Sequence, residues 1–118
     1  MTPRHVRLAV AAVATAALLL VTAPSASAAR DCQPPDYPGS GYFTSLSVKG
    51  TTCAKGKKLA RAYYRCRTDA GGRRGRCNRR VMRYSCSETR QSISTEFNAR
   101  VRCKRGSKRI THTYQQNT

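Results

Sequence analysis

The sequence has no tryptophan, only two phenylalanines, and only five acidic residues against 23 lysines and arginines. Because large apolar side chains are scarce in a chain of this size, we expect a thin core that packing alone stabilises poorly. Secreted domains of such length commonly compensate with disulfides. The shortage of acids leaves a positive surface with few internal partners.

Several motifs that carry chemistry are also missing. There is no C-x-x-C, no Gly-x-Ser-x-Gly, and a single histidine, His112, outside the first 28 residues. Structural zinc sites and serine triads both need such residues at such spacings. No signature of a nucleic-acid-binding module is present either. We therefore expect no metal, no cofactor and no enzymatic activity.

The first 28 residues have the three parts of a secretory signal. Arg4, His5 and Arg7 precede an Ala-, Val- and Leu-rich stretch, Leu8 to Val21, and Ala26-Ser27-Ala28 offers small residues for cleavage. As a helix the apolar stretch reaches about 21 Å, which is short of a ~30 Å hydrocarbon core. We predict cleavage before Ala29, secretion to the extracellular space, and no membrane span afterwards.

Six cysteines follow this segment, and in an exported chain they are expected to form disulfides. Cys53 and Cys66 cannot pair with each other across an intact helix, since about 20 Å separates them. Geometry favours three pairs: Cys32–Cys53, Cys66–Cys77 and Cys86–Cys103. The main alternative joins the helix to the sheet, through Cys53 with Cys86 or Cys103.

The pattern along the chain predicts one domain over 42–114, after a Pro- and Gly-rich arm at 29–41. Tyr42 to Val48 alternates as a strand, with Tyr42, Leu46 and Val48 on one face. Thr51 or Thr52 caps a helix from Cys53 to about Arg67, in which Gly56 would allow close approach to a sheet. Residues 71–80 are predicted to form a mobile loop.

Three further strands are predicted after this loop. The inward faces carry Met82, Tyr84 and Cys86 in the first, Phe97, Ala99, Val101 and Cys103 in the second, and Ile110, His112 and Tyr114 in the third. Residues 115–118 are expected to fray as a polar tail. The order β-α-β-β-β indicates a small disulfide-stapled α+β domain. Its antiparallel sheet would have one helix on one face.

Charge is the main indication of function. Without Arg4 and Arg7 the net charge falls only from +18 to +16, which exceeds what solubility requires. Such a surface attracts polyanions, including cell-wall polymers and nucleic acid. We expect a monomer that binds them non-specifically through loop 71–80 and the outward face of the strand that carries Phe97, Ala99, Val101 and Cys103. The candidate residues are Arg73, Arg74, Arg76, Arg79, Arg80, Arg100, Arg102 and Lys104.

The stretches SVKGTTCAKGKKLARAYYRCR, RYSCSETR and FNARVRCKRGSKRITHTY resemble small secreted proteins of actinobacteria. The resemblance covers roughly residues 42–114. Its motifs are structural: Cys53 at the helix start, and Cys86 and Cys103 on strands. It implies a fold and an extracellular location but no activity.

Two other functions are alternatives. A protease inhibitor or effector would use segment 67–76, which lies between Cys66 and Cys77 and is rich in arginine. A ribonuclease would need Glu96, Arg100, Arg102 and His112 to converge. Strand parity places His112 on the apolar face and Glu96 on the other, which argues against a shared phosphate site.

Overall fold

The computed structural model describes residues 11–20 and 28–118. Residues 11–20 are exposed and form no helix or strand. The rest of the predicted signal, including residues 26 and 27 at its cleavage site, lies outside the described residues. Within the described ranges, no helix combines the length and the apolar character needed to cross a bilayer.

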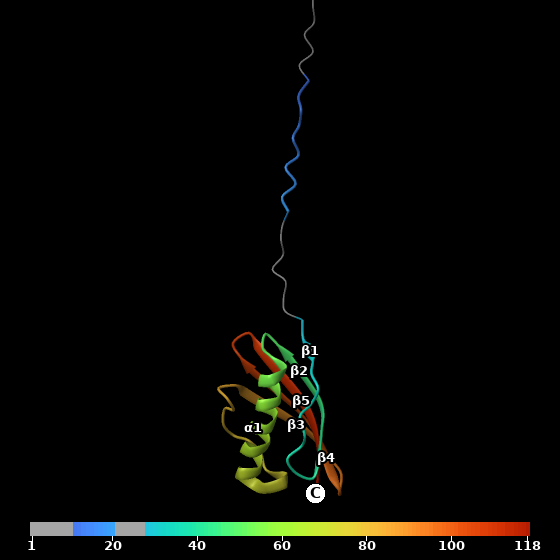
Figure 1. The fold of residues 1–118 in the computed structure, drawn as a ribbon, viewed down its shortest axis with the longest axis vertical. Helices are drawn as coiled ribbons and strands as arrows, with labels where there is room; N and C mark the ends of the chain where they lie inside the picture. Colours follow the sequence, from blue (N-terminus) through green and yellow to red (C-terminus); the bar gives the residue numbers. More distant parts are fainter. Residues whose placement is uncertain (1–10, 21–27) are drawn as a thin grey trace, which may run out of the picture.

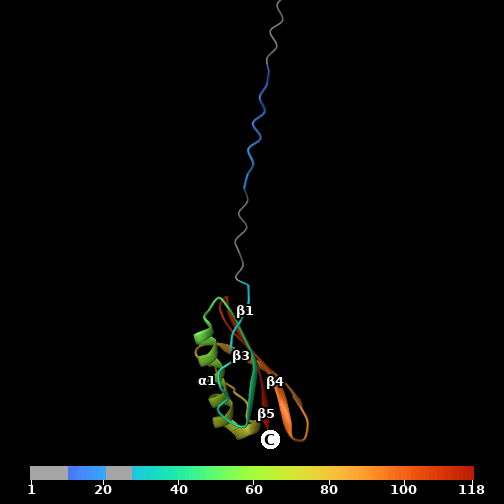
Figure 2. The same ribbon diagram turned by 45° about the vertical axis from the view of Figure 1, so that its right-hand side comes forward.

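A five-stranded antiparallel sheet with one helix on one face makes up residues 30–117 (Figures 1 and 2). The strands lie in the order β1-β2-β5-β4-β3, so the last strand is the central one. The elements are β1 (Arg30–Asp31), β2 (Gly41–Lys49), α1 (Cys53–Gly71), the short 3-10 helix η1 (Gly72–Arg74), β3 (Ser85–Ser92), β4 (Glu96–Arg105) and β5 (Lys108–Asn117). The predicted disulfide-stabilised α+β class is confirmed, with β1 as an addition.

Helix α1 begins where predicted, because the Thr52 hydroxyl accepts a hydrogen bond from the Lys55 amide. Gly56 faces β2, and a β-carbon there would lie only 2.7 Å from Val48 Cγ1. The helix therefore packs directly on the sheet, as the glycine predicted. It ends at Gly71, four residues later than expected, and Gly72 follows with a positive φ of 67°.

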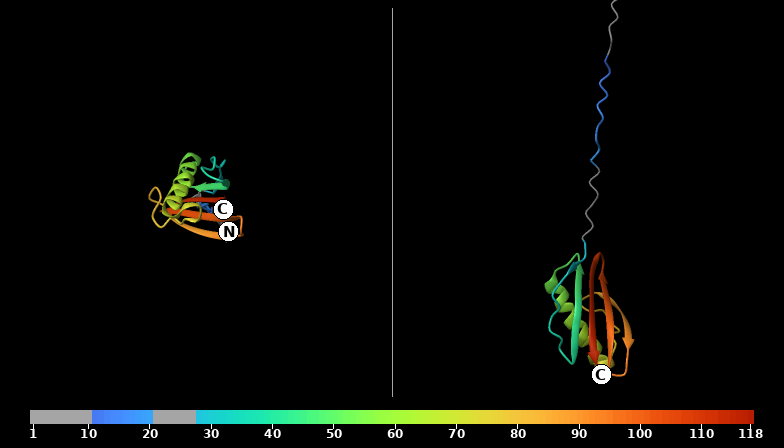
Figure 3. Two further views of the ribbon diagram at one scale, coloured as in Figure 1. Left: turned by 90° about the horizontal axis from the view of Figure 1, so that it is seen from below. Right: turned by 90° about the vertical axis from the view of Figure 1, so that its right-hand side faces the viewer.

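The core lies between α1 and the inward face of the sheet. It contains the predicted inward residues of β4 and β5, together with helix and β2 residues. Its most completely buried apolar members are Leu46, Val48, Leu59, Tyr63, Phe97, Val101, Ile110 and Tyr114. No helix or strand of residues 28–118 covers the opposite face of the sheet (Figure 3, left).

The predicted inward position of Tyr42 is wrong. Its side chain is 64% exposed, and Phe43 packs against the core instead. The cause is a register shift in the β2–β5 ladder between Phe43 and Ser45. A bulge of this kind inserts one residue and so reverses the alternation on one side of it.

The predicted strand through Met82 and Tyr84 is also wrong. Val81 and Tyr84 exchange two backbone hydrogen bonds across a tight turn, and Met82 and Arg83 at its tip both have positive φ. Positive φ at both central residues is the pattern of a type I′ turn. Met82 and Arg83 are therefore exposed at a turn, and β3 begins only at Ser85.

The C-terminal residues do not fray as predicted. Strand β5 continues to Asn117, and Gln116 is buried with 1% of its surface exposed. Its side-chain amide donates to the Ser40 carbonyl, and its amide oxygen accepts from Tyr37 and Arg67. The polar tail is thus part of the folded domain.

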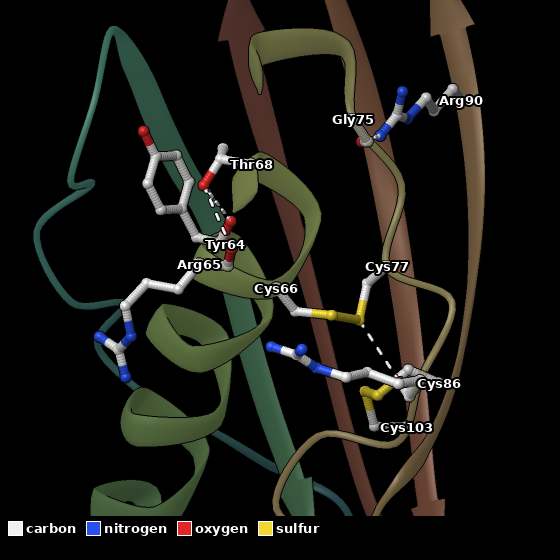
Figure 4. The surroundings of a disulfide bond; sticks show 10 residues. Tyr64, Arg65, Cys66, Thr68, Gly75, Cys77, Cys86, Arg90 and Cys103 are labelled. Carbon is white, nitrogen blue, oxygen red and sulfur yellow. Dashed lines mark hydrogen bonds between the residues drawn. A yellow bond between two sulfur atoms is a disulfide. The ribbon is translucent and has the colours of Figure 1, made fainter. Parts of the chain in front are cut away.

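Three disulfides join Cys32 to Cys53, Cys66 to Cys77 and Cys86 to Cys103. These are the pairs that the sequence analysis preferred. Cys32–Cys53 ties the N-terminal arm to the helix start, and Cys66–Cys77 ties the helix to the following loop (Figure 4). Cys86 and Cys103 lie directly opposite each other on β3 and β4.

Candidate polyanion-binding surface

The uncovered face of the sheet carries a row of cations along β4. Because Phe97, Ala99, Val101 and Cys103 point into the core, the residues between them point outward. Arg100, Arg102 and Lys104 are all exposed. Arg109 of β5 lies opposite Lys104 and extends the row sideways. We call these four residues the open-face cations.

Hydroxyl side chains flank two of the open-face cations, Arg100 and Arg102, on both neighbouring strands. By register, Arg100 lies between Thr89 of β3 and Thr113 of β5. Arg102 likewise lies between Ser87 and Thr111. The right-hand view of Figure 3 shows β5 and β4 side by side, with β3 at the edge. The face is therefore polar and basic throughout this region.

Two hollows indent this face. One, of about 490 Å³, is lined by residues that include Arg100, Arg102, Thr89 and Thr113. The other, of about 420 Å³, is lined by Arg102, Lys104 and Arg109 among others. Arg102 belongs to both, so the hollows follow each other along β4.

Hydrogen bonds and a disulfide tie residues 73–77 to the helix and to β3, contacts that the predicted mobile loop did not include. Gly75 is buried, and Cys77 is bonded to the helix through Cys66. The Arg67 guanidinium donates to the Arg73 carbonyl at 2.9 Å, and the Arg90 guanidinium donates to the Arg74 carbonyl at 2.9 Å and to that of Gly75. Figure 4 shows Arg90 reaching Gly75.

The loop cations lie on the helix side of the sheet, because Arg90 and the other β3 residues that hold the loop point inward. Arg73, Arg74, Arg79 and Arg80 are exposed. Arg76 is different, since its guanidinium lies 3.6 Å from the carboxylate of Glu88 and part of its charge is neutralised. The structure thus splits the predicted site into two surfaces.

These two surfaces approach each other at the start of β3. A hollow of about 260 Å³ there is lined by Arg79, Arg80, Ser85 and Cys86. Ser85 and Cys86 also line the hollow that holds Lys104 and Arg109. Arg79 and Arg80 are therefore the loop cations nearest to the open face.

A buried polar network supports both surfaces from inside. Arg67 is 1% exposed and donates to Tyr37 and, at 2.7 Å, to Gln116. Glu88 accepts hydrogen bonds from Arg90 at 2.6 Å and from the Tyr114 hydroxyl. Burial raises the pKa of Tyr37 to about 12 despite the charge of Arg67, so the phenol stays protonated.

This buried network was not predicted, although the spacing of its residues in the sequence indicates that they point inward. Arg67 follows Tyr63 by four residues and Cys66 by one, which places it on the buried stripe of α1. Arg90 and Glu88 have the same strand parity as Cys86. Arg109, Thr111 and Thr113 also belong to the open face, where their alternation with Ile110, His112 and Tyr114 places them, but they were not among the predicted binding residues.

His112 lies inside the core, as strand parity predicted. It is 1% exposed, and among the described atoms neither ring nitrogen has a hydrogen-bond partner. Burial lowers its pKa to about 3. Its ring packs edge-on against Phe43 and Tyr63. Glu96 points to the other side of the sheet, opposite Asn117, so these residues do not form a ribonuclease centre.

The segment proposed for an inhibitor is largely helical. Residues 67–71 complete α1, and η1 occupies 72–74. Gly75 is then buried. The structure therefore offers no extended exposed loop between Cys66 and Cys77, and the inhibitor alternative gains no support from it.

In residues 11–20 and 28–118, no three His, Cys, Asp or Glu side chains cluster in a way that could hold a metal ion. No protein-family model, curated protein or solved structure matches the chain significantly. The resemblance to secreted actinobacterial proteins thus stays a prediction.

Proposed function

We propose that this protein is secreted and binds anionic polymers, mainly through the open-face cations of β4 and β5. The main support for this proposal is that one hollowed face of the sheet holds four cations, Arg100, Arg102, Lys104 and Arg109. Three disulfides are typical of proteins in oxidising compartments and support the extracellular location.

Few carboxylates accompany these cations, which favours an external anion as their partner. Of the acidic residues in the described part of the chain, Glu88 is buried and already bonded to Arg90. Glu96 lies at the far start of β4, opposite Asn117, and Asp31 lies at the edge of the sheet on β1. The remaining two, Asp36 and Asp69, lie in the N-terminal arm and on α1. The positive potential along β4 is therefore not cancelled by neighbouring acids.

Binding of this kind proceeds by release of counterions, so its affinity falls with salt. Four cations that contact a single-stranded polyanion predict a slope of about −3 for log affinity against log salt concentration. Arg79 and Arg80 add to the field from the β3 edge, whereas Arg73 and Arg74 lie on the helix side. We therefore expect the loop to contribute less than the open face.

The test compares two variants of equal net charge in the purified, oxidised protein. One changes Arg100, Arg102 and Lys104 to Gln, and the matched control changes the exposed helix residues Lys55, Lys58 and Arg61 to Gln. Affinity for heparin and for a single-stranded oligonucleotide is measured over a salt series. We expect the open-face variant to reduce the slope to about −1, while the helix variant keeps most of the affinity.

Equal losses in the two variants would show that overall charge, not the open face, is responsible. Absence of measurable binding by the unaltered protein at low salt would refute the proposed function itself. Circular dichroism and thermal unfolding of each variant verify that the fold is retained.

A further inference from the structure

Along β4 the open face repeats a pattern of side chains, and this pattern indicates the kind of ligand that the face binds. Outward residues on one strand are about 7 Å apart. Each outward cation of β4 has polar neighbours on both sides: Thr89 and Thr113 beside Arg100, and Ser87 and Thr111 beside Arg102. The third, Lys104, has Ser85 and Arg109. Two successive outward positions of β4 thus present the same chemical unit, a cation with a hydroxyl group on each side, and Lys104 adds a third cation with one hydroxyl group beside it.

The shape of the face suits a thin chain laid along β4. Both hollows are lined by Arg102, and the flanking rows on β3 and β5 are about 10 Å apart. A single extended polymer strand fits between such rows, with its anions over the cations of β4. A ligand running across the strands would meet only one cation of this row.

The kind of anion follows from the side chains. Two of the three β4 cations are arginines, whose planar guanidinium binds phosphate through two parallel hydrogen bonds. Hydroxyl groups of serine and threonine both donate and accept hydrogen bonds. They are suited to the ester oxygens and hydroxyls that lie between successive phosphates.

Nucleic acid fits this face less well than a polyol chain. Proteins that bind single strands stack bases on aromatic side chains, but the outward positions of β3, β4 and β5 from Ser85 to Gln115 carry no aromatic residue. The exposed Tyr42 lies on β2, beyond β5. Because Tyr42 pairs with Gln115 near the end of β5, the positions around the β4 cations have partners for phosphates and hydroxyls but none for bases.

We propose that the open face binds an extended polyol phosphate chain, such as a polymer of glycerol phosphate, aligned with β4. One phosphodiester lies over each of Arg100, Arg102 and Lys104. The hydroxyls of β3 and β5 lie beside the cations, and they contact the ester oxygens of each phosphodiester and the adjoining polyol units. This inference rests on the proposed function and adds the ligand class and its orientation.

The experiment measures binding of a glycerol phosphate oligomer, a single-stranded oligonucleotide with the same number of phosphates, and heparin, at one low salt concentration. The oxidised protein is compared with Thr89→Val/Thr111→Val, which removes two flanking hydroxyls and keeps side-chain shape and charge. The matched control is Thr51→Val/Thr95→Val, away from the hollows. Thermal unfolding verifies the fold of each variant.

We expect the unaltered protein to prefer the glycerol phosphate oligomer over the oligonucleotide. The Thr89/Thr111 variant should lose about tenfold in affinity for that oligomer, because each lost hydrogen bond weakens binding severalfold. Its affinity for heparin should be unchanged, as should all affinities of the control. A matched loss for heparin would assign the effect to a general disturbance of the face and overturn the inference.

Equal or tighter binding of the oligonucleotide or of heparin would overturn the polyol phosphate inference, while the proposed polyanion function would stand. Failure to bind any of the three ligands would overturn both. Arg102→Gln tests the proposed polyanion function separately from the ligand class, since this variant should bind all three ligands more weakly.

Discussion

The guanidinium of Arg67 lies 4.5 Å from the centre of the Tyr114 ring, inside the core of the domain. No carboxylate oxygen of the described residues lies within 4.0 Å of Arg67. The buried charge is instead matched by this ring and by hydrogen bonds to Tyr37, Gln116 and the Arg73 carbonyl. Cation–π contact with a desolvated ring is worth about 2 kcal/mol.

Replacing Arg67 by Lys should destabilise the domain although the charge is kept. An ammonium lacks the planar fork that reaches Arg73, Gln116 and Tyr37 together. We expect a loss of about 3 kcal/mol in the free energy of unfolding, comparable to breaking a buried charged network. Denaturant unfolding measures it. Arg65→Lys, on the exposed side of the same helix, is the control, and equal stability of the two variants would contradict the prediction.

His112 should make stability depend on pH in mildly acidic solution. Its folded pKa is lowered to about 3, below the ordinary value of 6.5, so below pH 6.5 the unfolded chain takes up a proton that the folded chain does not. Stability is therefore complete above pH 6.5 and falls as pH decreases, by at most about 1.4 kcal/mol per pH unit. Denaturant unfolding between pH 7 and pH 5, above most carboxyl titration, measures this slope. In His112→Phe the slope should vanish, and a slope that persists would refute its assignment to His112.

Gly75 should tolerate no side chain. A β-carbon there would lie 1.8 Å from the Arg67 carbonyl oxygen and 2.9 Å from the Gly71 amide nitrogen, both backbone atoms. We expect Gly75→Ala to lower stability by about 2 kcal/mol, in the range of overpacked substitutions. Gly71→Ala is the control, because nothing lies within 4 Å of its β-carbon position and its φ of −167° suits any residue. Thermal unfolding of the two variants should differ clearly, and similar curves would contradict the close contact.

Replacing Met82 and Arg83 at their turn should increase the stability of the domain. Both residues have positive φ, 51° and 66°, where side chains cost roughly 1 kcal/mol each. Asn-Gly is the preferred pair for such a turn. We therefore expect Met82→Asn/Arg83→Gly to raise the free energy of unfolding by about 1 kcal/mol. Arg79→Gly removes the same charge without a positive φ to relieve, and an equal gain there would show that charge, not turn geometry, is responsible.

Alternation alone was sufficient to predict the central strands. The inward residues of β4 and β5 were predicted correctly because their ladder has no irregularity from Glu96 to Arg105. The helix start at Thr52 and the close contact at Gly56 were also predicted, since a cap and a missing side chain are local properties. Preferred disulfides followed from the same local geometry.

The errors arose where tertiary contacts override a local pattern. Nothing in the sequence around Tyr42 shows that β2 shifts register at Thr44, which reverses the face of one aromatic residue. The GGRRGRCNRR segment is rich in glycine and charge, but two buried guanidiniums bind its carbonyls and fix it. The loop and the outward strand face were predicted to bind together, whereas Arg73 and Arg74 of the loop lie on the helix side of the sheet and only Arg79 and Arg80 approach the open face.

The placement of the three disulfides divides the domain into two covalent halves. Cys32–Cys53 and Cys66–Cys77 close loops before residue 78, and Cys86–Cys103 closes one after residue 85. A protease that cuts after the exposed Arg79 or Arg80 would thus produce two fragments with no covalent bond between them. They would stay together through the β2–β5 ladder, from Gly41–Gln116 to Lys49–Arg109, the core beneath it, and the hydrogen bonds of Arg90 and Gln116 to the first fragment. The domain is in this sense a natural candidate for fragment complementation, in which two separately made chains reassemble into one sheet.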